Sequence, residues 1–207
     1  MMMVVLVIGM AACTPKNANQ ETATTQEPTA LDNIFARKSV RQYTSEPITA
    51  EQLEMLVKAA MAAPSGRNLQ PWHFVVVTDQ AIKDSMVTNN HNKMISEAAA
   101  VVVVCAETMT KMKASPDATE EVLMENQLWR DDCAAATENL LLAAEAMGLG
   151  AVWTACYPFE ERMNPVRAAV GLPENITPYA VVPIGHPAGN DQPKDKWKPE
   201  KVHYDRW

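Results

Sequence analysis

Four stretches of the chain are almost continuously apolar and rich in small or β-branched residues. Two of them, at 72–78 (WHFVVVT) and 98–106 (AAAVVVVCA), have the length of strands. Such runs predict central strands that are covered on both faces. The stretches at 150–157 (GAVWTACY) and 178–185 (PYAVVPIG) predict a third and a fourth strand. The hydrophobic pattern therefore predicts a central β-sheet.

Helical periodicity fills the segments around these strands. Residues 49–63 begin with Thr49 three positions before Gln52, the spacing of a capping box. One apolar stripe follows, made of Leu53, Leu56, Val57, Ala60 and Met61. Residues 31–36 carry a short helical pattern, and residues 79–86 predict a short helix. We expect the helix at 49–63 to bury one face.

Ser115 and Pro116 have the order of an N-cap and a first helical proline, and they predict a long helix that ends at Gly148. Its second half, residues 133–148, is almost entirely small or apolar. A helix of that composition is buried all round, either in a core or against another subunit. The prediction is one long and deeply buried helix.

Asn164 and Pro165 predict the start of a later helix that runs through Val170 and ends at Gly171. The order of all these elements does not alternate strictly between strand and helix. It therefore favours an α+β or mixed α/β layer over a doubly wound parallel sheet.

The N-terminal residues 1–13 form an apolar run that is too short to span a bilayer as a helix and closes on small residues before Cys13. The tetrapeptide before and including Cys13 resembles a bacterial lipobox, although no Lys or Arg precedes the run. Residues 14–30 are polar and predict a disordered tether. We expect a lipoprotein facing the periplasm or cell exterior, with a folded domain at 31–207. The alternatives are an ordinary N-terminal strand and a cytoplasmic location.

Composition narrows the possible partners and sites. The chain has 207 residues, 47% of them hydrophobic, which is enough for one domain with a real core. A net charge of -7 argues against nucleic acid or an anionic membrane surface as the main partner. No CxxC pair or close His/Cys group predicts a metal site, and Cys105, Cys133 and Cys156 are expected to be buried free thiols.

Two basic clusters stand out in this acidic chain. The first contains Arg37, Lys38, Ser39 and Arg41 within five residues. The second contains Lys194, Lys196, Lys198 and Lys201 within eight residues. Arginine offers a forked donor and lysine a point charge, so either cluster could hold a phosphate group. The alternative is a solvated charged face.

The segment at 63–74 (APSGRNLQPWHF) places many hydrogen-bonding groups between a predicted helix and a predicted strand. Asn68 and Gln70 could supply both donors and acceptors to a ligand, or could cap backbone groups of the loop. The chain has no Walker A sequence and no GxSxG, and the glycines of GLGAVW follow a helix and enter a strand, which is the reverse of the Rossmann order.

Taken in order, the segments 37–43, 63–77, 134–153 and 181–189, the last followed by PKDK at 193–196, resemble the nitroreductase family of flavin enzymes. The match covers Leu31 to Trp207. The resemblance implies an α+β sandwich with a central mixed β-sheet flanked by helices, which dimerises through long apolar helices and binds FMN at the subunit interface.

The resemblance also implies the cofactor contacts. Those at the phosphate and pyrimidine side would be Arg37, Lys38, Ser39 and Arg41, with Lys194 and Lys196. Those at the flavin ring would be Pro64, Ser65, Asn68 and Gln70, with the backbone of Trp153, Thr154, Ala155 and Cys156. The chain departs from the family twice. Lys196 stands where Arg is frequent, and no Gly occurs near Ala155 or Cys156.

The implied activity is hydride transfer from a small-molecule donor, NADH or NADPH, through flavin N5 to an electron-poor acceptor such as a nitroaromatic or quinone. No catalytic residue is required, since the cofactor carries the chemistry. Segments such as 89–98 and 109–122, where we expect the substrate face, have no readable signature. Alternatives are reductive dehalogenation or flavin breakdown on the same scaffold, and a cofactor-free surface binding lipoprotein. Nicotinamide nucleotides are scarce outside the cell, so a lipoprotein location leaves the donor open.

Overall fold

The computed structural model describes residues 28–207. The expected signal segment and residues 14–27 of the expected tether lie outside this range. Thr29 and Ala30, assigned to the tether by the sequence pattern, form the N-cap and first residue of helix α1 (Ala30–Ala36), with Asp32 completing a capping box. Within the described range, no helix is both long and apolar enough to cross a membrane.

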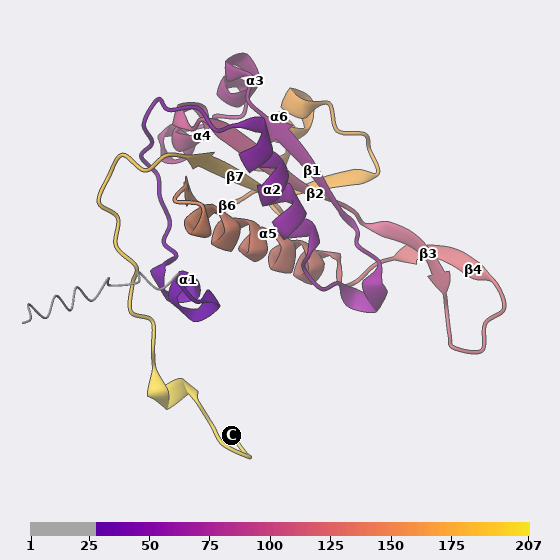
Figure 1. The fold of residues 1–207 in the computed structure, drawn as a ribbon. Helices are drawn as coiled ribbons and strands as arrows, with labels where there is room; N and C mark the ends of the chain where they lie inside the picture. The colour runs from indigo at the N-terminus through magenta and orange to yellow at the C-terminus, as the bar shows by residue number, and fades with distance from the viewer. Residues whose placement is uncertain (1–27) are drawn as a thin grey trace, which may run out of the picture.

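A five-stranded antiparallel sheet lies at the centre of the molecule (Figure 1). Its main path runs in the order β1 (Trp72–Val77), β2 (Ala100–Glu107), β7 (Ile176–Gly185) and β5 (Gly150–Ala151). The short strand β6 (Thr154–Ala155) also pairs with β7. Helices flank this sheet, so the expected α+β class is confirmed.

Two of the strand predictions need correction. Strand β1 is an edge strand of the described sheet, with Trp72 and Val77 buried and His73 exposed, and is not covered on both sides. The apolar run at 150–157 is not one strand, because Val152 and Trp153 separate β5 from β6. The prediction of a central strand covered on both faces is confirmed for β2, whose first seven residues are all buried.

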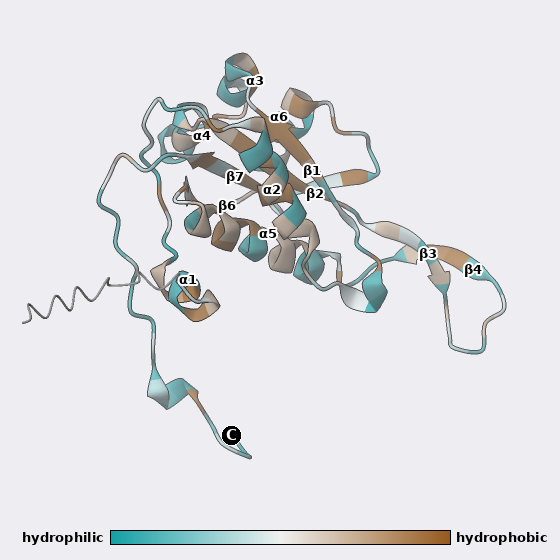
Figure 2. Ribbon diagram, in the orientation of Figure 1, coloured by the Kyte–Doolittle hydropathy of each residue, from teal (hydrophilic) through white to brown (hydrophobic). Residues whose placement is uncertain are grey.

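The two faces of β2 belong to two hydrophobic clusters. Val102 and Val104 pack with α2 (Ala50–Met61) and α5 (Trp129–Ala146). Their neighbours Val101 and Val103 pack with a second cluster that includes residues of α4 (Met94–Glu97) and α6 (Glu160–Val170), beside α3 (Gln80–Ser85). Strands β1, β2 and β7 form the most hydrophobic layer of the ribbon (Figure 2). The sheet is therefore covered on both faces, as strictly apolar strands require.

Helix α5 is the buried helix that the composition predicts, because every residue from Asp132 to Glu145 is buried or half-buried. Its predicted start at Ser115 is wrong. Residues before it form a hairpin of β3 (Met109–Lys113) and β4 (Glu121–Glu125), in which Lys113 lies opposite Glu121. Residues of β3 alternate between exposed and half-buried positions, as in a strand with one covered face, and Ser115 lies in the turn between the two strands.

The helix caps follow the sequence in most places. Thr49 and Gln52 form the predicted capping box of α2, although Met61 at the end of the apolar stripe is exposed. Helix α6 ends at Gly171, which has φ 64° as a left-handed C-cap should. Its predicted start is wrong, since Pro165 lies inside the helix and not at its first turn.

Candidate functional site

The two basic clusters, which are about 150 residues apart in sequence, meet in one cavity of about 310 Å³. The cavity is lined by Arg37, Lys38, Ser39, Arg41, Asp191, Gln192, Lys194 and Lys196. Five of these eight side chains are cationic and one is anionic. The structure thus brings together all six residues predicted to hold the phosphate side of a ligand.

Backbone pairing explains why the two ends of the chain converge. The Val40 N–H donates to the Ala151 carbonyl at 3.0 Å, which fixes the first cluster beside β5. The Thr44 N–H donates to the His186 carbonyl at 2.9 Å, and the Ala188 N–H donates to the Gln42 carbonyl at 3.0 Å. The C-terminal segment therefore leaves β7 alongside the first cluster and carries its lysines into the cavity.

Two of the five cations are already paired with helix α5. Arg37 Nε lies 3.2 Å from Glu138 Oε1, and Lys38 Nζ lies 2.8 Å from Glu145 Oε1. Arg41, Lys194 and Lys196 make no ion pair with any residue from 28 to 207. Three cations without an ion-pair partner, set against the single carboxylate of Asp191 in the cavity lining, produce a site that favours a doubly charged anion such as a phosphate monoester.

The loop at 64–70 has an unusual backbone. Arg67, Asn68 and Gln70 have φ values of 54°, 56° and 50°, a region that non-glycine residues adopt rarely and that collects at functional sites. The Gln70 side-chain amide donates to Asn68 Oδ1 at 2.9 Å, and the Gln70 N–H donates to Ser65 Oγ at 3.1 Å. The two amides thus form a hydrogen-bonded pair, and both residues are exposed on the turn.

Helix α5 holds this loop and the cationic cavity at its opposite ends. The Gly66 N–H donates to Asp132 Oδ1 at 2.7 Å in the first turn of α5. Lys38 pairs with Glu145 in the last turn, 13 residues later, which is about 20 Å along the helix axis. Figure 1 shows α1 and the loop after α2 at the two ends of α5. The loop residues and the cations therefore do not share a cavity within one chain.

The segment 153–156 continues directly from the strand that pairs with the cationic cluster. Ala155 is exposed, whereas Thr154 is half-buried and its hydroxyl donates to the Val181 carbonyl at 2.5 Å. Cys156 has its thiol buried, its N–H bonded to the Tyr179 carbonyl at 3.1 Å and its carbonyl bonded to the Phe159 N–H at 3.0 Å. Of the predicted ring-facing backbone, Ala155 is thus the accessible part.

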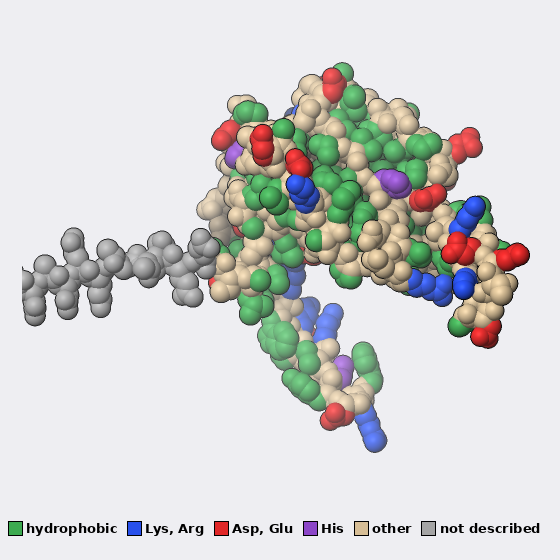
Figure 3. All heavy atoms as spheres, turned by 45° about the vertical axis from the view of Figure 1, so that its right-hand side comes forward, with side chains coloured by type: hydrophobic (Ala, Val, Ile, Leu, Met, Phe, Trp, Pro, Cys, Tyr) green, Lys and Arg blue, Asp and Glu red, His purple; other side chains and the backbone are tan. Residues whose placement is uncertain are grey.

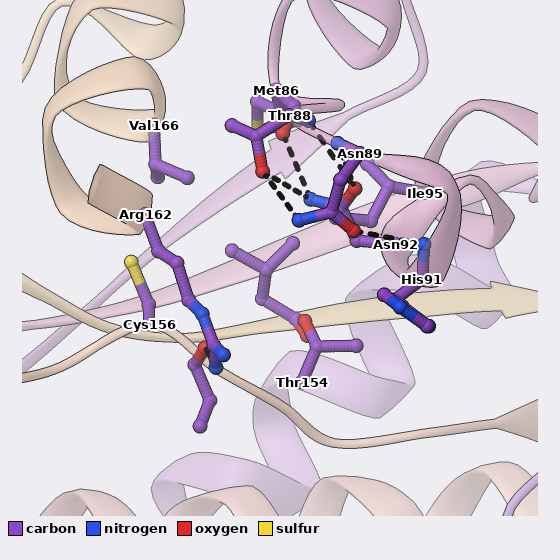
Figure 4. A pocket seen from close by; sticks show the side chains of 12 residues that line it. Met86, Thr88, Asn89, His91, Asn92, Ile95, Thr154, Cys156, Arg162 and Val166 are labelled. Carbon is purple, nitrogen blue, oxygen red and sulfur yellow. Dashed lines mark hydrogen bonds between the residues drawn. The ribbon is translucent and has the colours of Figure 1, made fainter. Parts of the chain in front are cut away.

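A second cavity, of about 270 Å³, opens beside Thr154 and Ala155 (Figure 4). Its other wall is the turn after α3, where Asn92 Oδ1 accepts the N–H groups of Thr88 and Asn89 at 3.2 and 3.1 Å. Side chains of His91 and Arg162 also line it. This turn belongs to the segment 89–98, where the substrate face is expected from the sequence, and the Asn89 to Asn92 spacing has the form of a capping box.

Comparison with known proteins shows which family has this architecture. A sequence profile described as the nitroreductase family matches residues 34–186. The chain belongs to the nitroreductase family. A nitroreductase-family relative from Archaeoglobus fulgidus, described as a candidate NADH dehydrogenase/NAD(P)H nitroreductase, is 39% identical over 181 residues, which cover 86% of this chain and 98% of the relative.

Solved structures of nitroreductase-like proteins have the same fold. A candidate NADH dehydrogenase/NAD(P)H nitroreductase from Bacteroides thetaiotaomicron is 45% identical, covers 86% of this chain and 98% of its own, and gives a TM-score of 0.76. A candidate nitroreductase from Desulfovibrio desulfuricans, solved in complex with FMN, is 27% identical, covers 88% and 99%, and gives a TM-score of 0.68.

Proposed function

We propose that this protein is an FMN-dependent oxidoreductase that transfers hydride from NADH or NADPH to an electron-poor acceptor, such as a nitroaromatic or a quinone. The observation that carries the proposal is the cationic cavity. Two clusters from opposite ends of the chain meet there, and Arg41, Lys194 and Lys196 have no carboxylate partner among the described residues. That donor set fits the phosphate of a flavin mononucleotide.

The residues around the cavity fit the remainder of the cofactor. Ser39 lies in the cavity and is bridged to Ala151, and the chain runs from there to the exposed Ala155. We assign the flavin ring to this exposed edge, with the Asn68 and Gln70 amides at its hydrogen-bonding side. Bound FMN would supply the redox chemistry, accepting hydride from one substrate and passing it to the next.

Completion of this site requires a second copy of the chain. The amide loop and the cationic cavity of one chain lie at opposite ends of α5. If both contact one cofactor, the loop has to come from a second subunit. We therefore propose a homodimer with two sites, each built from the cavity of one subunit and the loop of the other.

Cofactor retention tests the assignment directly. Purified protein should be yellow and should release FMN on denaturation. Arg41→Ala removes an unpaired cation from the cavity, and we expect FMN affinity to fall at least tenfold, because charge-assisted phosphate bonds are worth about 1.5–3 kcal/mol each. Fluorescence titration of the apoprotein with FMN measures the change.

The matched control is Lys58→Ala, which removes an exposed cation of α2 that pairs with Glu54 and does not line the cavity. It should leave FMN affinity unchanged. Stoichiometric FMN in Arg41→Ala at sub-micromolar concentration would contradict the phosphate assignment.

We also propose that Cys13 is lipidated, on the strength of the lipobox-like sequence at 10–13. Radioactive fatty acid fed to intact cells should label the protein, and Cys13→Ser should abolish the label. An unlabelled wild-type protein would exclude the anchor and favour a location where NADH and NADPH are abundant.

A further inference from the structure

A third cavity, of about 310 Å³, lies between the β3–β4 hairpin and the amide loop. The hairpin projects from the body of the molecule beyond the end of α5 (Figure 1). The cavity walls are largely apolar and contain Leu69, Met112, Met124 and Leu128. Methionine side chains are flexible and polarizable, and they adapt well to flat aromatic molecules.

The polar groups of this cavity are mainly hydrogen-bond donors. Arg67 and Lys113 line it, and Arg67 Nη1 lies 3.2 Å from Met112 Sδ. Asn126 also lines it and is 2% exposed; its Oδ1 accepts the Leu128 N–H at 3.0 Å. Asn126 Nδ2 has no hydrogen-bond partner among the described residues. A buried donor without a partner is costly, but this nitrogen is almost inaccessible to solvent, so the charged donors that the cavity offers to a ligand are those of Arg67 and Lys113.

Charge makes the cavity selective for anionic oxygen. Two cations, Arg67 and Lys113, line it against one carboxylate, Glu125. Basic and acidic side chains gather at the side of the surface where the hairpin projects (Figure 3). A single excess cation matches one carboxylate group, and the apolar walls match an aromatic ring.

We propose that this cavity is the acceptor site and that it selects planar aromatic acceptors carrying a carboxylate. The inference rests on the proposed function. Gly66 and Arg67 line the cavity, while Asn68 and Gln70 of the same turn are the residues assigned to the flavin ring. A molecule in the cavity therefore lies beside the ring that this loop contacts.

The electron balance of the reaction is simple. For a nitroaromatic acid, oxidation of NAD(P)H to NAD(P)⁺ provides two electrons and one proton as hydride, and solvent provides a second proton. One N–O bond of the nitro group breaks, water leaves and the nitroso compound remains. The carboxylate is unchanged, so its effect is on binding alone.

The test compares 4-nitrobenzoate with the neutral 4-nitrobenzamide, which has nearly the same shape. Wild-type protein should have the higher kcat/KM for the acid. Lys113→Gln and Arg67→Gln should each lower kcat/KM for the acid about fivefold and change that for the amide less than twofold, because one cation at a partly exposed site contributes about that factor. Arg67→Lys should restore most of the preference.

Lys111→Gln is the matched control, since Lys111 lies on the same strand but does not line the cavity. It should leave both acceptors unaffected. FMN content and the rate of cofactor reduction by NADH or NADPH without acceptor are measured for every variant.

Three results would overturn the inference. If Lys113→Gln and Arg67→Gln keep normal FMN content and reduction rate but leave the preference for the acid unchanged, the acceptor site is wrong and the proposed function stands. The same conclusion follows if both substitutions slow the acid and the amide equally. If wild-type protein binds no FMN, the proposed function fails and this inference fails with it.

Discussion

The three cysteines of the described chain are held as protonated thiols by burial. Cys105, Cys133 and Cys156 are all free and buried, as the sequence predicted. Burial raises the pKa of each thiol from 9.0 to about 12. A thiol with such a pKa is neither a nucleophile nor a metal ligand at neutral pH, so these residues act in packing.

Alkaline pH should therefore destabilise the fold. The unfolded chain loses thiol protons from about pH 9 and the folded chain does not until about pH 12, so the unfolded state binds fewer protons between these values. Below pH 9 the thiols therefore cause little loss in the free energy of unfolding, and the loss grows as the pH rises above 9. We expect a loss of about 1 kcal/mol per thiol at pH 10, measured by urea unfolding.

Cys133→Ala isolates the contribution of one thiol. Its unfolding free energy should fall less steeply between pH 9 and pH 10.5 than that of the wild type. Equal slopes would mean that these thiols do not cause the alkaline loss of stability.

Helices α1 and α2 begin with the same type of capping box, but they differ in what they bury. Helix α2 places Leu56 and Ala60 in the core, whereas α1 has no buried residue. A cap therefore stabilises the core of one subunit only in α2, because α1 can fray without exposing surface that is buried within that subunit.

Thr49→Ala should lower the free energy of unfolding by about 1 kcal/mol, the usual effect of losing an N-cap side chain. Thr29→Ala removes the corresponding hydroxyl from α1 and should have a much smaller effect. Thermal unfolding of the two variants tests this, and equal losses would show that α1 unfolds together with the core.

Elements whose signals are local could be predicted from the sequence, and elements that depend on pairing could not. The Thr49 capping box and the left-handed Gly171 are local and are found where expected. Ser115 and Pro116 fit both a helix start and a turn, so the local pattern predicts a helix from Ser115 where the structure has the hairpin turn and strand β4. The edge position of β1 depends on which strand pairs with it and has no signature in its own residues.

Over the whole molecule, apolar side chains of α1 and the C-terminal segment remain exposed. Leu31 and Phe35 are 63% and 73% exposed, and Trp197 and Trp207 are 70% and 100% exposed. Large exposed apolar groups of this kind mark interaction surfaces. They lie on segments next to the cationic cavity, where the proposed homodimer requires contact.

Phe35→Lys should therefore weaken the dimer while leaving the chain folded, because Phe35 contributes little to the core of one subunit. Sedimentation should show wild-type protein at twice the chain mass and the variant at the chain mass, with less FMN retained. Val76→Lys, on the exposed side of the edge strand β1, is the control and should remain dimeric. A monomeric wild-type protein that retains FMN would contradict the shared site.

The candidate site could be predicted from the sequence as a set of residues but not as an arrangement. The two clusters of like charge, one with Arg41 and the other with Lys194, are visible in the sequence, and the structure brings these residues into one cavity. Their separation from Asn68 and Gln70 by the length of α5 is a property of the folded chain. The pairing of Lys38 with Glu145 is also a property of the folded chain, because no local sequence pattern predicts it.

Because α5 keeps the amide loop and the cations of the cavity apart, two inactive variants of a chain that forms the proposed shared site would restore activity to one another when mixed. A chain with a damaged loop still offers intact cations, and a chain with damaged cations still offers an intact loop. A heterodimer of the two variants would have one site with an intact cavity and an intact loop, and a second site in which both are damaged. Random mixing makes half of the pairs hybrid, so about a quarter of the original turnover should return from two preparations that have none.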